Sequence, residues 1–391
     1  MTLLLLAVIY IAFISLGLPD SMTGSVWPVM HLTFSVPLES AGLISMVTCL
    51  GTILSSLLSG KLTRKFSTWQ ITTASIILTS VSLFLISRTT AFWQVILLAL
   101  PLGLGGGSID AALNNFVALH YKKKQLSFLH GFWGIGTLVG PVLISALLTE
   151  GRSWRNAYSS VSAIQLIIFL IVLASYPLWK LYSGSPETEA ESGNDKISYL
   201  DVLRVKGVPF AIVSFLIYCA FENSTMLWAA SYMVYDKGFD AASAASLSGM
   251  VFLGLTAGRI LNGLFGDLFQ DRHIIRFSLV FITVSAILLI FQDTIIMCYI
   301  CLFLLGMGFG PIFPVMIHET VLYYDKKYSQ TIIGLQMAFA YMGCTLLPPV
   351  YGLIATGISQ SALPFFVLIL NGLLAITVTK KAIYAKKAGR F

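Results

Sequence analysis

One carboxylate with suitable surroundings for proton chemistry lies deep in an apolar stretch of the sequence. Asp110 follows a glycine-rich run, residues 103–107, and precedes two adjacent amides, within an apolar segment from 91 to 119. A charge placed there costs at least about 2.5–3.5 kcal/mol on insertion into a membrane, so it usually faces a cavity and marks an ion or substrate pathway. We interpret Asp110 as a proton or pathway site. The alternative is a buried polar clamp between helices.

A second carboxylate, Asp20, lies where the first apolar stretch is expected to break. Pro19 precedes it, and Gly24 and Pro28 follow within about two turns. Such residues interrupt helical hydrogen bonds and free backbone groups to face a cavity. A carboxylate at this break can take up a proton, which makes Asp20 a second candidate for proton coupling. The alternative is that Asp20 only caps the second half of the broken helix.

Aromatic and polar side chains in other apolar stretches are suited to binding a sugar. Tryptophan faces fit the apolar C–H faces of a pyranose, while amides and carboxylates hydrogen-bond its hydroxyls. A tryptophan at the end of a span is, however, commonly an interfacial anchor, and His130 lies close enough to a basic loop for an interfacial role. The candidates of this kind are Trp27, His130, Trp133, Tyr218, Glu222, Asn223, Trp228 and Gln336.

The composition requires that these residues are carried by membrane helices. The chain has 391 residues, of which 57% are hydrophobic and 10% charged, and its mean hydropathy is +0.86. Soluble domains carry about 25% charged residues, so we predict a polytopic membrane protein. Apolar residues begin at Leu3 without a preceding basic region, so a cleaved signal peptide is not expected.

Twelve apolar stretches are long enough to cross about 30 Å of hydrocarbon, the ninth and tenth being separated by the turn at Gln292 and Asp293. Lys and Arg concentrate in alternate loops and in the tail after the last stretch, where Lys381 is counted, and this places both termini in the cytoplasm. The net charge of +7 is therefore a topology signal rather than a sign of nucleic-acid binding. The opposite loops hold Arg88, Arg152, Arg155 and Lys237.

The longest polar segment, residues 179–206, divides the apolar stretches into six plus six. We predict an N-terminal six-helix bundle over 1–178, a cytoplasmic linker over 179–206 and a C-terminal bundle with a short basic tail over 207–391. A second glycine-rich run at 306–310 echoes the first and suggests pseudo-symmetry. The expected fold class is all-α, with twelve transmembrane helices in two six-helix bundles, the major facilitator fold.

No pattern indicates an enzyme or an ATP-driven pump. The run 103–107 lies in a span and lacks the Gly-Lys-Ser/Thr ending of a nucleotide-binding loop. Neither a nucleophile–base pair nor metal-ligand spacing occurs, so we expect no metal and no cofactor. Transport then depends on an ion gradient or on the gradient of the substrate.

Several motifs together resemble the fucose/galactose/glucose:proton symporter family of the major facilitator superfamily, nearest to its bacterial glucose/mannose-type members. They are Gly17-Leu18-Pro19-Asp20 with Trp27-Pro28, Asp110 to Val117, His130 to Gly136, Glu222 with Trp228, Gly258-Arg259, and Gly306 to Pro314. They span nearly the whole chain.

The resemblance implies particular roles for the matching residues. Asp20 and Asp110 match family acids that serve proton coupling and sugar binding, and Asn114 matches an amide that contacts sugar. Asn115 stands where fucose permeases have a proline, so fucose itself is not assigned. Asn115 is a further candidate for substrate binding, next to Asn114. The segment from Gly258 to Asp267 resembles the superfamily's cytoplasmic loop signature, which makes Arg259 and Asp267 candidates for gating.

The resulting hypothesis is a monomeric, proton-coupled symporter of a hexose or related polyol in a bacterial plasma membrane. It would work by alternating access of the two bundles. One alternative is a proton-coupled antiporter that exports amphipathic or lipid-like compounds, and another is a sugar sensor that does not transport. Sodium stays an alternative coupling ion, because carboxylates and the carbonyls of broken helices also ligate it.

Overall fold

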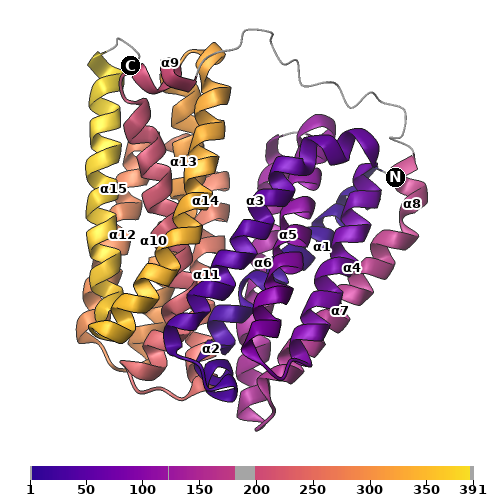
Figure 1. Ribbon diagram of the computed structural model, residues 1–391. Helices are drawn as coiled ribbons and strands as arrows, with labels where there is room; N and C mark the ends of the chain where they lie inside the picture. The colour runs from indigo at the N-terminus through magenta and orange to yellow at the C-terminus, as the bar shows by residue number, and fades with distance from the viewer. Residues whose placement is uncertain (1, 122, 181–198, 388–391) are drawn as a thin grey trace. The chain divides into compact units, whose positions relative to one another are not determined.

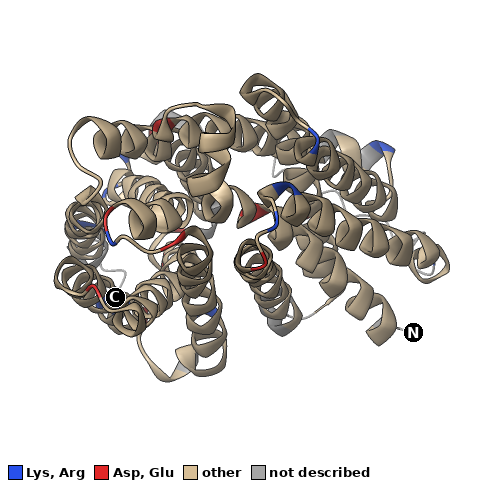
Figure 2. Cartoon of the chain, turned by 90° about the horizontal axis from the view of Figure 1, so that it is seen from below, with Lys and Arg blue, Asp and Glu red and all other residues tan. Residues whose placement is uncertain are grey.

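The computed structural model describes residues 2–121, 123–180 and 199–387, which form α-helices and two short 3-10 helices (Figure 1). Twelve helical segments in these residues are long and apolar enough to span a membrane, which confirms the predicted all-α membrane fold. The ninth and tenth spans separate between Phe291 and Ile295, at the predicted turn. Figure 2 shows few charged segments along the helices.

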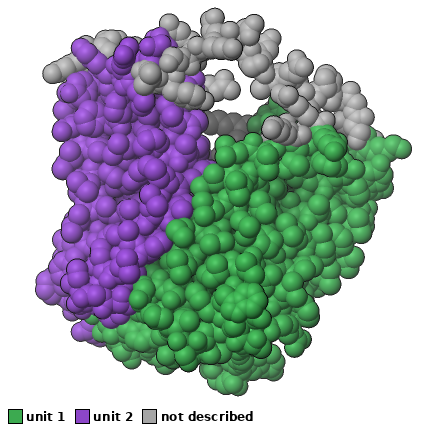
Figure 3. Space-filling view, in the orientation of Figure 1, with its two compact units in different colours: residues 1–188, 226–253 green, residues 189–225, 254–391 purple. Residues whose placement is uncertain are grey.

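The chain forms two compact units, which Figure 3 colours separately. Unit 1 comprises Met1–Thr188 and Met226–Leu253, and unit 2 comprises Glu189–Thr225 and Gly254–Phe391. Residues 226–253 thus cluster with the first part of the chain. The predicted linker, 179–206, lies largely outside the described residues, and the predicted bundle boundaries at 178 and 207 stay predictions.

The helices before residue 181 all belong to unit 1. They are α1 Thr2–Asp20, α2 Met22–Phe34, the 3-10 helix η1 Leu38–Ser40, α3 Ala41–Lys65, α4 Thr68–Ser87, α5 Phe92–His120, α6 Lys123–Thr149, α7 Trp154–Ala174 and α8 Tyr176–Lys180.

The later helices form unit 2, except that the second part of α10 and the first part of α11 belong to unit 1. They are α9 Tyr199–Arg204, α10 Val208–Tyr235, α11 Ala241–Phe265, the 3-10 helix η2 Gly266–Leu268, α12 Asp271–Phe291, α13 Ile295–Tyr323, α14 Lys326–Gly357 and α15 Ala362–Lys387.

Short polar residues fix several helix starts. Ser67 and Gln70 form a capping box at the start of α4, in which each side chain bonds the other's backbone N–H. Before α11, the Asp240 carboxylate accepts hydrogen bonds from the N–H groups of Ala242 and Ser243, both at 3.0 Å. The bonds from Ser243 hold the pKa of the Asp240 carboxyl below its usual range, because they stabilise its charged form.

The glycine-rich run of α5 allows neighbouring helices to approach closely. A Cβ at Gly103 would collide with the backbone oxygen of Thr48, and one at Gly107 would lie 2.7 Å from that of Thr52, both on α3. A Cβ at Gly105 would meet α4 instead. Since small residues permit backbone contact in lipid, this run fixes α5 against two helices and determines where the carboxylate just beyond it lies.

Unit 2 repeats this device between α11 and α13. A Cβ at Gly254 would collide with the backbone oxygen of Phe303, and one at Gly310 would lie 2.6 Å from that of Leu255. The glycine echo seen in the sequence therefore corresponds to close helix packing along both glycine-rich runs.

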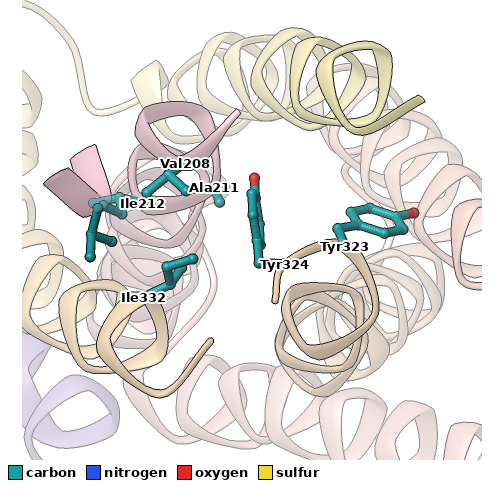
Figure 4. Packing of buried hydrophobic residues seen from close by; sticks show 7 residues of the cluster. Val208, Ala211, Ile212, Tyr323, Tyr324 and Ile332 are labelled. Carbon is teal, nitrogen blue, oxygen red and sulfur yellow. The ribbon is translucent and has the colours of Figure 1, made fainter. Parts of the chain in front are cut away.

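A cluster of buried apolar residues lies in unit 2 at the end where α9 precedes α10 (Figure 4). Val202 of α9 is fully buried in it, beside Val208 of α10 and Ile332 of α14. Gly207, between α9 and α10, has φ +92° and faces the hydroxyl of Tyr324. A left-handed residue in so close a contact favours glycine, and it lets α9 fold onto the cluster.

We expect Gly103→Ala to destabilise the protein by about 1–3 kcal/mol, because the new methyl group must displace the α3 backbone. The matched control is Gly372→Ala on α15, where an added Cβ would have open space. There, alanine's higher helix propensity favours the helix. Thermal unfolding of purified protein in detergent measures both. Equal melting temperatures for the two variants would contradict the close packing of α3 and α5.

Candidate functional site

Asp20 lies where the first membrane span breaks. α1 ends at Asp20 and α2 begins at Met22, with Pro19 inside the last turn of α1. Proline lacks an N–H and clashes with the preceding turn, so it disturbs the helical ladder at this point. The N-cap position of α2 is Ser21 rather than Asp20. Asp20 is thus a residue of the break, not the cap of the second half-helix.

The Asp20 carboxylate has a partner on α6. The indole N–H of Trp133 donates to Asp20 Oδ2 at 2.8 Å. Gly17 keeps α1 close to α6 here, because a Cβ at this position would collide with the backbone oxygen of Trp133. Asp20 is exposed although it lies inside the span Leu3–Phe34. Since hydrocarbon offers no hydrogen-bond donors, an exposed carboxylate inside a span is expected to face a water-filled cavity.

Asp110 and Asn114 lie one turn apart on α5. The Asn114 amide donates to Asp110 Oδ1 at 2.8 Å and to its backbone oxygen at 3.0 Å. Asp110 is close enough to Asp20 for the two charges to interact. Helices α1, α5 and α6 therefore bring together Asp20, Asp110, Asn114 and Trp133, which we call the acid site.

The other candidates from the first part of the chain lie outside these contacts. Asn115 is exposed, one position round the helix from Asn114. His130 is partly buried with its ring edge-on to Phe13, at 5.8 Å between centroids. Trp27 is fully buried, and its indole N–H donates to the backbone oxygen of Leu38 at 2.7 Å. Their roles in substrate binding stay predictions.

In unit 2, Glu222 of α10 pairs with Arg259 of α11. Arg259 Nη2 lies 3.4 Å from Glu222 Oε1, and both side chains are largely buried. An oppositely charged partner lowers the cost of placing a carboxylate inside a span. Arg259, predicted as a gating residue, is thus the partner of a predicted substrate-binding residue.

Asp267, the second predicted gating residue, lies in η2, and its side chain is outside the described part of the structure. The gating role predicted for Arg259 and Asp267 therefore stays a prediction.

Among the remaining candidates of the second half of the chain, Tyr218 interacts with Glu222 and Arg259. The Tyr218 hydroxyl is buried and donates to the backbone oxygen of Phe309 at 2.9 Å. Asn223 donates to the backbone oxygen of Cys344 at 3.3 Å. Gln336 is fully buried and bonds the Thr320 hydroxyl at 2.9 Å. Trp228 is buried in the part of α10 that belongs to unit 1.

A buried ion pair was not anticipated from the sequence. Lys381 of α15 contacts Glu319 of α13, and both side chains are at most 2% exposed. The Tyr323 hydroxyl donates to the same carboxylate at 2.9 Å. Counting Lys381 with the basic tail was wrong, since it lies buried in the last span. Glu319 and Lys381 are too far apart in the sequence for a spacing rule to pair them. A carboxylate in an apolar span nevertheless indicates that it has a partner.

The membrane spans of unit 1 contain little positive charge. Among the described residues, Arg155 is the only Lys or Arg in these spans. It donates to the backbone oxygen of Thr89 at 2.7 Å and stacks over Trp154. The two carboxylates of the acid site are thus held by the neutral N–H donors of Trp133 and Asn114.

The chain resembles known membrane transporters over most of its length. It is 22% identical over 343 residues to the glucose/mannose transporter GlcP of Bacillus subtilis, covering 86% of this chain and 84% of that protein. It is 24% identical over 353 residues to the nitrite extrusion protein of the same organism, covering 87% and 85%.

Among solved structures, a mutant of the nucleoside transporter NupG superposes with a TM-score of 0.75 at 12% identity, covering 96% of this chain and 98% of that one. At this identity the likeness concerns the fold alone. The profile of the Major Facilitator Superfamily matches residues 9–221 and 210–388. With the twelve spans, this match shows that the chain belongs to the Major Facilitator Superfamily and is a multi-pass membrane transporter rather than an enzyme.

Proposed function

We propose that the chain is a proton-coupled symporter of a neutral, hydroxylated molecule, a hexose or related polyol. The observation that carries this proposal is the acid site, in which Asp20 and Asp110 accept hydrogen bonds from the neutral groups of Trp133 and Asn114. Two nearby carboxylates repel each other, so a proton on one of them relieves the repulsion. The same groups can exchange hydrogen bonds with sugar hydroxyls.

In the proposed cycle, a proton binds first to Asp20 or Asp110. Neutralising one carboxylate lowers the cost of closing the site to water, because a buried charge without a counter-ion is unfavourable. The substrate then takes hydrogen bonds from Asn114 and Trp133, and closure follows. Release on the other side frees the proton, so that substrate and proton move together.

Charge favours a neutral substrate over an anion. An anion at the acid site would meet two carboxylates, and the Arg259 guanidinium in unit 2 is engaged by Glu222 at 3.4 Å. The relatives include both a sugar transporter and a nitrite extrusion protein. The chemistry of the acid site supports the first of these substrate classes.

The remaining features of the proposal follow from the sequence. We propose that both termini face the cytoplasm, because most loop Lys and Arg residues are then cytoplasmic, and that the membrane is a bacterial plasma membrane. The protein works as a monomer, and Arg259 and Asp267 serve gating.

A panel of substrates in proteoliposomes tests the substrate class. We expect an imposed pH gradient, acid outside, to drive accumulation of at least one labelled hexose, without sodium and without inhibition by nitrate. Hydrophobic cations exported against protons would instead support the antiporter. Nitrate uptake in place of hexose uptake would overturn the proposal.

We expect Asp110→Asn to abolish hexose accumulation driven by the pH gradient, because the amide cannot take up a proton. Exchange of labelled for unlabelled hexose across the membrane should persist, since exchange requires no net proton movement. The matched control is Asp240→Asn, which keeps a good N-cap residue outside the acid site. Accumulation by Asp110→Asn at the wild-type level would show that this residue does not couple the proton.

We expect Trp133→Phe to raise the pH at which uptake is half-maximal. The ring is kept while the N–H that stabilises the charged form of Asp20 is lost, and removing one bond to a charged group costs about 1.5–3 kcal/mol. The control is Trp69→Phe, which removes an indole N–H bonded to the backbone oxygen of Val172 elsewhere in unit 1. An unchanged pH profile for Trp133→Phe would remove Trp133 from the acid site.

A further inference from the structure

We infer that His31 and Tyr235 form a latch that holds the end of α2 to the end of α10 more tightly when His31 is protonated. Both residues lie in unit 1, although α2 comes from the first half of the chain and α10 from the second. The inference rests on the proposed function, because a carrier that works by alternating access must open and close contacts between its two halves.

Three contacts define the latch. His31 Nε2 lies 2.5 Å from the hydroxyl of Tyr235, and His31 Nδ1 lies 3.1 Å from the backbone oxygen of Val36. The Tyr235 hydroxyl is also 3.3 Å from the backbone oxygen of Pro28. His31 is 9% exposed and Tyr235 39% exposed, so Tyr235 is the more accessible member of the latch.

Neighbouring contacts support a joint between the same elements. Ser25 Oγ lies 3.0 Å from Ser248 Oγ of α11. At Gly24, an added Cβ would lie 2.6 Å from the backbone oxygen of Met226, so α2 and α10 approach without side chains between them. Helices α2 and α10 are thus in contact through backbone as well as through side chains.

Donor counting gives the direction of the pH effect. A carbonyl only accepts, so Nδ1 must carry a hydrogen to bond Val36, and in the neutral ring Nε2 is then an acceptor. Tyr235 must donate its only hydrogen to Nε2 and therefore cannot donate to Pro28. When Nε2 gains a proton it donates to Tyr235, whose hydrogen turns to the Pro28 oxygen. Protonation thus adds one hydrogen bond, and the bonds to Tyr235 and Val36 become bonds from a charged donor, which contribute more than neutral ones and offset the cost of the buried charge.

The charged groups on the neighbouring segments are of both signs. Asp236 and Lys237 pair at 3.9 Å just after α10, and Glu150 and Arg152 pair at 2.9 Å after α6. Glu39 of η1 and Arg155 of α7 carry opposite charges. The other titratable group at the latch is Tyr235, which stays neutral in the range from about pH 5 to 8 where histidine changes charge. A pH effect at the latch in this range would therefore come from His31 rather than from Tyr235.

Hydrogen exchange measured by mass spectrometry on the purified full-length protein tests the latch. The peptides to follow cover residues 22–36 and 226–238. After correction for intrinsic rates, we expect exchange in both to be about three- to tenfold slower near pH 5.5 than near pH 7.5, the factor that one hydrogen bond supplies. Wild-type exchange without this pH dependence would overturn the inference.

Two variants isolate the histidine. In His31→Gln, the side-chain amide can donate to Val36 and accept from Tyr235 as the neutral ring does, so the protein should stay latched and lose the pH dependence. Tyr235→Phe removes the hydroxyl that connects His31 to Pro28, so this variant should also lose the pH dependence of hydrogen exchange. The control is His120→Gln, whose ring bonds the backbone oxygen of Phe116 on α5, and it should behave as wild type. Retained pH dependence in His31→Gln would contradict the latch.

Hexose uptake by the same samples separates this inference from the proposed function. Hexose uptake together with hydrogen exchange that does not depend on pH would leave the symporter proposal intact and contradict the latch. Absence of hexose uptake with pH-dependent exchange would remove the symporter proposal, while the latch would stand as a feature of the transporter.

Discussion

The cost of a charge in hydrocarbon is the constraint on which this structure depends. Every carboxylate in a span must find a hydrogen-bond donor, a cation or water. Unit 2 meets this need with cations, since Glu222 contacts Arg259 and Glu319 contacts Lys381. The acid site of unit 1 meets it with neutral N–H groups and exposure. The two units therefore treat the same problem in different ways.

This difference bears on which carboxylates suit the proposed proton coupling. A carboxylate bonded to a buried lysine has a fixed counter-charge, and protonating it would leave the lysine uncompensated. A carboxylate bonded to an indole or an amide has no counter-charge to lose, so protonation removes the net charge. Asp20 and Asp110 are of the second kind, which is why they, rather than Glu319, suit a proton that binds and leaves.

Much of the fold could be predicted from the sequence, because membrane spans depend on local hydropathy. The twelve spans and the break beside Pro19 followed from single stretches of residues. The pairing of Asp110 with Asn114 was within reach because one helical turn separates them. Trp133 was singled out as a sugar platform, yet its N–H bonds Asp20, and Lys381 was counted with the basic tail. Both depend on contacts between distant helices, which no local pattern encodes.

The pairing of Glu319 with Lys381 has a consequence for biogenesis. Ribosomes deliver α13 well before α15, so Glu319 enters the bilayer while its lysine is still to be synthesised. Until α15 arrives, this carboxylate must stay hydrated or protonated, and α13 cannot settle into its final packing. Removing one partner of a buried ion pair typically costs about 3–5 kcal/mol. Synthesis that stops between these two helices would therefore leave a nascent chain whose Glu319 carboxylate has no lysine partner in the bilayer, a feature that the complete protein lacks.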